Sequence, residues 1–82
     1  MDMAYMYQRA ERAEQILRDG DVWADVFPHD EAFIAVEINN GDWKHDHLRA
    51  GWLLESAGYT HISEVVTEED GSDCYSAIHY FR

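Results

Sequence analysis

The sequence has one cysteine, one proline and no long apolar run. A single cysteine excludes an internal disulfide, so nothing covalent braces the fold, as is usual for proteins of a reducing cytoplasm. No apolar stretch approaches the roughly 20 residues of a membrane-spanning helix, and the acidic beginning lacks the basic region of a signal peptide. We therefore expect one cytoplasmic domain over residues 1–82 with no membrane partner.

Basic residues are also scarce. Six Lys and Arg stand against 17 Asp and Glu, which gives a net charge of −11 with neutral histidine. Such a charge opposes a compact state by self-repulsion, so solubility alone is a weak reason for it. Direct binding to nucleic acid or to an anionic membrane is excluded, because affinity there comes from Lys and Arg. The expected partner is a basic protein surface. A halophilic or generally acidic proteome is the alternative explanation.

Signatures of catalysis are missing. The chain has no Gly-rich phosphate loop and no serine elbow. Cys74 follows Asp73, and a neighbouring negative charge disfavours a reactive thiolate. Acid–base catalysis by two carboxylates needs one of them in an apolar pocket. The positions of the 17 Asp and Glu residues in the sequence do not indicate such a pair. We predict that the protein is not an enzyme and uses no cofactor.

Five histidines invite a metal hypothesis, but their spacing does not support it. His45 and His47 point about 200° apart on a helix, because each residue turns by about 100°. A strand would place them on one face, yet the apolar period that follows favours a helix. His61 and His79 lie on opposite arms of the last predicted hairpin and become neighbours if its register allows. Without a cysteine pair or a spaced histidine set, we predict no metal site.

Two segments have apolar side chains at helical spacing. The first helix is predicted over residues 3–19 and ends at Gly20. The second runs from Trp43 to Ala57, with Asp42 as its N-cap and Gly58 as its end. Their core-facing residues are predicted to be Met3, Met6, Tyr7, Ala10, Ala13 and Leu17 in the first helix, and Trp43, Ala50, Leu53, Leu54 and Ala57 in the second, with His47 on the same side.

Each helix is followed by a predicted β-hairpin. Val22–Phe27 and Phe33–Ile38 form the first hairpin. Tyr59–Thr67 and Cys74–Arg82 form the second, around the acidic turn 68–73, in which Asp-Gly is a strong turn signal. The predicted element order is therefore α-β-β-α-β-β.

This order predicts an α+β fold with a four-stranded antiparallel sheet and two helices on one face. Such an arrangement buries both apolar helix stripes at once. A five-residue loop in the first hairpin pairs Val26 with Ile34 on the core face. The chain also divides into two similar halves, 1–41 and 42–82, which form a predicted pseudo-repeat supported by a short local sequence likeness.

Two surface features are candidates for partner binding. The first is a set of acidic side chains in loops and around the sheet, which can imitate a phosphate backbone and occupy a groove lined by Lys and Arg. A solvated edge that prevents aggregation is the alternative. The second is the apolar pair Leu48 and Trp52, which lie one turn apart in the second predicted helix, opposite its main apolar stripe. If exposed, this pair indicates a partner contact; a wider buried stripe is slightly favoured. The predicted partner-binding residues are Asp25, Asp30, Glu31, Glu37, Glu64, Glu68, Glu69, Asp70 and Asp73 for the acidic set, and Leu48 and Trp52 for the pair.

In its size, acidity and lack of a disulfide or catalytic motif, the whole chain resembles phage-encoded inhibitors of bacterial defence, especially small anti-CRISPR proteins and anti-restriction DNA mimics. The resemblance rests on no shared motif, so it assigns no residue. It implies an inhibitor that covers a basic nucleic-acid-binding groove, such as that of a CRISPR effector subunit, and blocks DNA binding in a bacterial host. The competing hypothesis is a small homodimeric accessory or antitoxin-like module that binds through the apolar pair. A metal- or ligand-binding domain is the third and weakest alternative.

Overall fold

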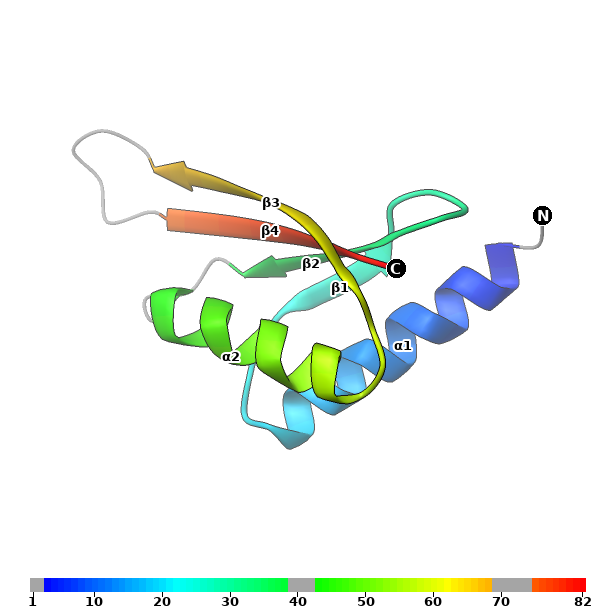
Figure 1. Cartoon of the computed structure of the whole chain (residues 1–82), viewed down its shortest axis with the longest axis horizontal. Helices are drawn as coiled ribbons and strands as arrows, with labels where there is room; N and C mark the ends of the chain where they lie inside the picture. Colours follow the sequence, from blue (N-terminus) through cyan, green and yellow to red (C-terminus); the bar gives the residue numbers. More distant parts are fainter. Residues whose placement is uncertain (1–2, 39–42, 69–74) are drawn as a thin grey trace.

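The computed structural model describes residues 3–38, 43–68 and 75–82 (Figure 1). The elements are helix α1 (Met3–Asp19), strands β1 (Asp25–Pro28) and β2 (Ile34–Ile38), helix α2 (Trp43–Ser56), and strands β3 (His61–Glu68) and β4 (Tyr75–Phe81). The predicted α-β-β-α-β-β order and α+β class are confirmed. In the described ranges, neither helix is both long and apolar enough to cross a membrane.

The four strands form one antiparallel sheet in the order β1-β2-β4-β3. The second strands of the two hairpins pair with each other in the centre, with Val36 opposite His79 and Ile38 opposite Ala77. The first strands of the hairpins, β1 and β3, form the two edges. Both helices lie on the same side of the sheet, as predicted, and no helix of the described ranges lies on the other face (Figure 1).

The first hairpin is shifted by two residues from the predicted register. Val26 pairs with Val36 instead of Ile34, because β1 continues to Pro28, which pairs with Ile34. A proline is tolerated there because β1 is an edge strand. A two-residue shift keeps every side chain on its predicted face. A compact loop closes the hairpin, since the Asp30 carboxylate accepts hydrogen bonds from the backbone N–H groups of residues 32 and 33 at 2.7 and 2.9 Å.

Residues 22–24 were predicted as strand but lie outside β1. The backbone N–H of Val22 donates to the carbonyl oxygen of Leu17 at 2.8 Å, so it ends α1 and is not available to a strand partner. Asp21 takes the left-handed conformation that permits this turn, with φ of 63°. Val22 is nevertheless fully buried. An apolar residue is therefore needed at this position even though it is not part of a strand.

The second helix ends in the same way as the first. The backbone N–H of Tyr59 donates to the carbonyl oxygen of Leu54 at 3.0 Å, and Gly58 takes φ of 99°. Glycine adopts this conformation without steric cost. The likeness of the two helix ends fits the division into halves 1–41 and 42–82, although the pseudo-repeat stays a prediction.

The core lies between the two helices and the sheet. Among the predicted stripe residues whose side chains are described, six are buried, Leu53 and His47 are half-buried, and Met3, Tyr7 and Ala57 are exposed. The side chain of Trp43 lies outside the described residues. Met3 and Tyr7 belong to the first two turns of α1, and Ala57 follows the last residue of α2. The largest fully buried side chains are Phe81, Leu17, Ile34, Ile38, Leu54, Val22 and Val36.

Candidate functional site

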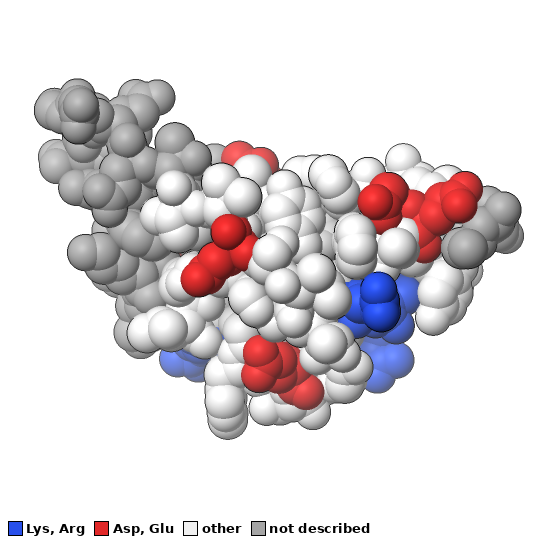
Figure 2. Space-filling view, turned by 45° about the horizontal axis from the view of Figure 1, so that its top comes forward, with Lys and Arg blue, Asp and Glu red and all other residues white. Residues whose placement is uncertain are grey.

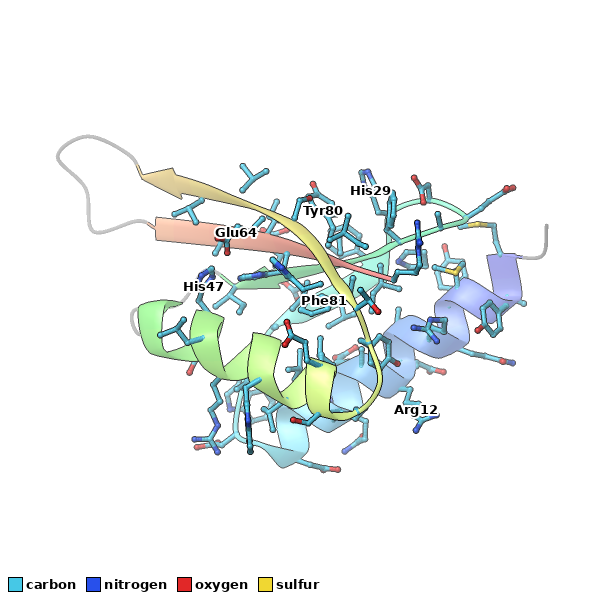
Figure 3. The ribbon with its side chains drawn as sticks, viewed as in Figure 1. Arg12, His29, His47, Glu64, Tyr80 and Phe81 are labelled. Atoms are coloured by element: carbon cyan, nitrogen blue, oxygen red, sulfur yellow. The ribbon has the colours of Figure 1, made fainter. Side chains whose placement is uncertain are left out.

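Three histidines and one glutamate meet between α2 and the second hairpin. His47 comes from α2, His61 and Glu64 from β3, and His79 from β4. Nε2 of His61 lies 3.1 Å from Nδ1 of His79, whose Nε2 in turn contacts Nδ1 of His47. Nε2 of His47 lies 3.1 Å from a carboxylate oxygen of Glu64 (Figure 3). Side chains far apart in the sequence therefore form one continuous polar cluster.

A bulge in β3 places two of these side chains on the same face. His61 is opposite Phe81, but an irregularity between His61 and Ser63 brings Glu64 opposite His79. Without the extra residue, the alternation of a regular strand would direct His61 and Glu64 to opposite faces. The bulge thus sets the composition of the cluster. The predicted proximity of His61 and His79 is confirmed.

His79 is the most unusual member of the cluster, since only 3% of it is exposed. Burial lowers the pKa of His79 to about 4; the neighbouring His47 and His61 act in the same direction, and Glu64 opposes them. The ring is therefore neutral at physiological pH. His79 lies on β4 between the buried Ala77 and Phe81. Because side chains alternate along a strand, it faces the core, where apolar side chains are expected.

The cluster borders an open groove of about 330 Å³ between α2 and β3. On the helix side, the groove is lined by Leu48, Gly51, Trp52 and Glu55. Leu48 and Trp52 are 74% and 68% exposed, so the wider buried stripe favoured by the sequence pattern is wrong. The apolar pair and the histidines therefore belong to one surface.

No family model, curated protein or solved structure matches this chain. Its function must be argued from its own geometry.

The uncovered face of the sheet carries an acidic pair. Asp25 on β1 is directly opposite Glu37 on β2. Both point away from the helices, because their neighbours Val26, Val36 and Ile38 pack into the core. Like charges in directly opposed positions destabilise an antiparallel pair.

The other predicted acidic residues do not join this pair into one strip. Asp30 and Glu31 are exposed in the loop at the opposite end of the first hairpin. Glu64 belongs to the histidine cluster. On the side shown in Figure 2, the described Asp and Glu side chains form separate groups. The predicted residues Glu69, Asp70 and Asp73 lie outside the described residues, and so does the side chain of Glu68.

Basic side chains gather where α1 meets the end of α2. Arg9 and Arg12 line a hollow of about 270 Å³ together with Tyr5 and Tyr59. The Tyr59 hydroxyl donates to the carbonyl oxygen of Arg9 at 2.9 Å, and the Arg9 guanidinium lies 4.5 Å from the Tyr59 ring centroid. Burial raises the pKa of Tyr59. These basic groups lie on the helix side, away from the acidic pair.

Proposed function

We propose that this chain is an acidic protein inhibitor that binds the basic nucleic-acid-binding groove of another protein and blocks DNA binding there. Anti-CRISPR and anti-restriction proteins are the class whose size and charge it resembles. Its net charge of −11 supports a cationic partner. The defence complex of a bacterial host, such as a CRISPR effector, is the partner class proposed.

The observation that carries this proposal is the acidic pair Asp25 and Glu37 on the uncovered sheet face. The two residues are directly opposite each other on paired strands. No helix of the described part of the chain covers this face. A uniformly acidic coat needs no such placement, whereas a partner groove lined by Lys and Arg gains from two neighbouring charges on one face.

The mechanism needs no chemical step. Carboxylates on the sheet face take the places of phosphates in the partner's groove, and the body of the domain excludes the nucleic acid. Because the attraction is between charges, binding weakens as salt screens it, with a Debye length of about 10 Å at 0.1 M. Inhibition should therefore be competitive with DNA and sensitive to ionic strength.

The test reverses one charge of the pair. We expect Asp25→Lys to weaken inhibition by roughly tenfold, because it removes an attractive charge and adds a repulsive one. Proteins captured by the immobilised chain from a nuclease-treated bacterial lysate are eluted with salt. Each is assayed for displacement of a fluorescent DNA duplex by the wild-type chain and the variant, at low and high salt.

A matched control separates a directed face from overall charge. Glu11 is exposed on α1, on the helix side of the sheet, and Glu11→Lys changes the net charge by the same amount. It should inhibit like the wild type. Asp25→Lys should also be slightly more stable, by roughly 0.2–1 kcal/mol, since it places an opposite charge against Glu37. Equal loss of inhibition in both variants, or no displacement of DNA by the wild type, contradicts the proposal.

A second candidate is a homodimeric accessory or antitoxin-like module. The exposure of Leu48 and Trp52 on α2 favours it, because tryptophan is enriched among the residues that dominate interface energies. Exposed apolar patches on a protein surface can mark sites of contact with another protein.

Light scattering of the pure protein tests this candidate. If the candidate is right, we expect a dimer whose dissociation constant rises at least roughly tenfold in Trp52→Ala. A loss of this size is typical when an aromatic residue at the centre of an interface is removed. Trp23→Ala is the matched control, since Trp23 is 63% exposed but lies in the segment between α1 and β1, outside α2. A wild-type chain that stays monomeric at every accessible concentration rejects the candidate.

A further inference from the structure

We propose that His47, Glu64 and His79 bind one divalent transition-metal ion of the zinc class. One potential ligand atom from each of the three side chains lies within 4.8 Å of the other two. Imidazole nitrogen and carboxylate oxygen are ligands that zinc and its first-row neighbours accept, whereas magnesium and calcium prefer oxygen alone. The site does not depend on the acidic sheet face, so either proposal can fail without the other.

The spacing of the donor atoms suits a shared ion. A carboxylate oxygen of Glu64 lies 3.1 Å from Nε2 of His47 and 3.7 Å from Nδ1 of His79. Ligand atoms about 2.0–2.1 Å from one tetrahedral zinc ion are roughly 3.3 Å apart. Two of the three donor pairs are thus already near the required separation, and the third pair lies within 4.8 Å.

The same side chains can also form a hydrogen-bonded chain without an ion. With neutral rings, His61 donates to His79, His79 donates to His47, and His47 donates to Glu64, so each ring uses its one proton. Among the described residues, no buried side-chain nitrogen or oxygen lacks a partner. An ion must replace at least one of these hydrogen bonds. Metal binding and the complete chain therefore exclude each other, which makes the difference measurable.

The surroundings give an ion access to the cluster. The groove beside it opens to solvent, so an ion has a path of entry. An ion would also link α2 to β3 and β4. A domain of this size without a disulfide gains stability from such a link, because metal binding free energy adds to that of folding.

The protonation state of the cluster is compatible with ligation. A histidine binds a metal only as neutral imidazole. The lowered pKa of His79, about 4, means that the ring need not lose a proton before it binds an ion at neutral pH. His61 contacts Nδ1 of His79, the nitrogen nearest to Glu64, so an ion bound there replaces the hydrogen bond from His61.

The experiment is a zinc titration of the full chain, expressed without a histidine tag and stripped of metal with a chelator. Calorimetry at neutral pH, in competition with a chelator of known affinity, should show one zinc ion per chain. Glu64→Gln should weaken binding at least tenfold, and His47→Ala should weaken it more, because each removes a ligand. Magnesium should not bind at this site.

Matched controls distinguish the site from general attraction to acidic groups. Glu55 lines the same groove but is not part of the cluster, so Glu55→Gln removes the same charge without removing a ligand. His29→Ala removes a histidine from an exposed loop. Both variants should bind zinc like the wild type. Circular dichroism of the metal-free variants checks that His47→Ala and Glu64→Gln are folded.

A second readout follows the rings themselves. On zinc addition, the ring ¹⁵N resonances of His47 and His79 should move, while those of His29 stay in place. Three results would each overturn the proposal: no zinc uptake by the wild type, equal affinity of Glu64→Gln and Glu55→Gln, or unchanged ring resonances of His47 and His79. Any of them would assign the cluster to the hydrogen-bonded chain instead.

Discussion

Phe81→Ala should lower the free energy of unfolding by about 3–5 kcal/mol, the usual result of removing a large aromatic from a packed core. Phe81 is fully buried on the central strand β4, opposite Ile34 on one side and His61 on the other. Its ring is in edge contact with that of His61, at a centroid distance of 5.3 Å. The substitution therefore leaves a cavity next to the histidine cluster.

The effect is large compared with the stability of the whole domain. Proteins have unfolding free energies of about 5–15 kcal/mol, and a chain of this length buries too little surface to lie near the upper end. Urea denaturation followed by circular dichroism should show a variant that is largely unfolded or close to its midpoint without denaturant.

Phe27→Ala is the matched control for this prediction. Phe27 is the same residue type on β1, but it points to the uncovered sheet face and is 41% exposed. Its removal should cost about 1 kcal/mol or less, because it vacates no enclosed space. Equal destabilisation by the two substitutions would mean that the core does not lie between the helices and the sheet.

The fold could be predicted because its two periodicities are strong. In α1, Met6, Ala10, Ala13 and Leu17 repeat at helical spacing, and all four are buried. The hairpin register was missed by two residues because Pro28 was assigned to the loop, although an edge strand accepts a proline at its end. The strand order could not be derived, since either strand of each hairpin can pair with the other hairpin.

The histidine cluster was only partly predictable. The proximity of His61 to His79 follows from the hairpin, and the inward side of His47 follows from the helical period. The position of Glu64 opposite His79 depends on a bulge that has no proline or glycine to signal it. A histidine between Ala77 and Phe81, in a row of core-facing positions, was the one available signal of an unusual site. The prediction that no metal is bound rested on sequence spacing alone, which says nothing about residues brought together by folding.

In metal-free protein, the free energy of unfolding should fall by about 3 kcal/mol between pH 6.5 and about 4 because of His79. The ring has a pKa of about 4 in the folded chain and an ordinary value of 6.5 when unfolded. Above pH 6.5 the His79 ring is neutral in both the folded and the unfolded chain, so it does not lower the free energy of unfolding. As the pH falls below 6.5, His79 binds a proton in the unfolded chain but stays neutral in the folded chain. The free energy of unfolding therefore decreases by about 1.4 kcal/mol per pH unit.

The surroundings of His79 explain why its pKa is low in the folded chain. Burial has the largest effect in lowering the pKa of His79; His47 from α2 and His61 from β3 act in the same direction, and Glu64 opposes them. Falling pH also protonates surface carboxylates and relieves the repulsion of a chain with net charge −11, which acts in the opposite direction. A single pH profile of the wild type therefore mixes two effects of opposite sign.

Comparison with His79→Gln isolates the histidine term. The substitution removes the titrating ring and leaves the surface carboxylates unchanged, so the difference between the two profiles should shrink as the pH falls from 6.5 toward 4. The measurement is urea denaturation with chelator present across this range. His29→Gln, in an exposed loop, should run parallel to the wild type throughout. A wild-type profile that stays parallel to that of His79→Gln would show that the folded chain takes up the proton as readily as the unfolded one, and that His79 is more hydrated than its burial beside His47 and His61 implies.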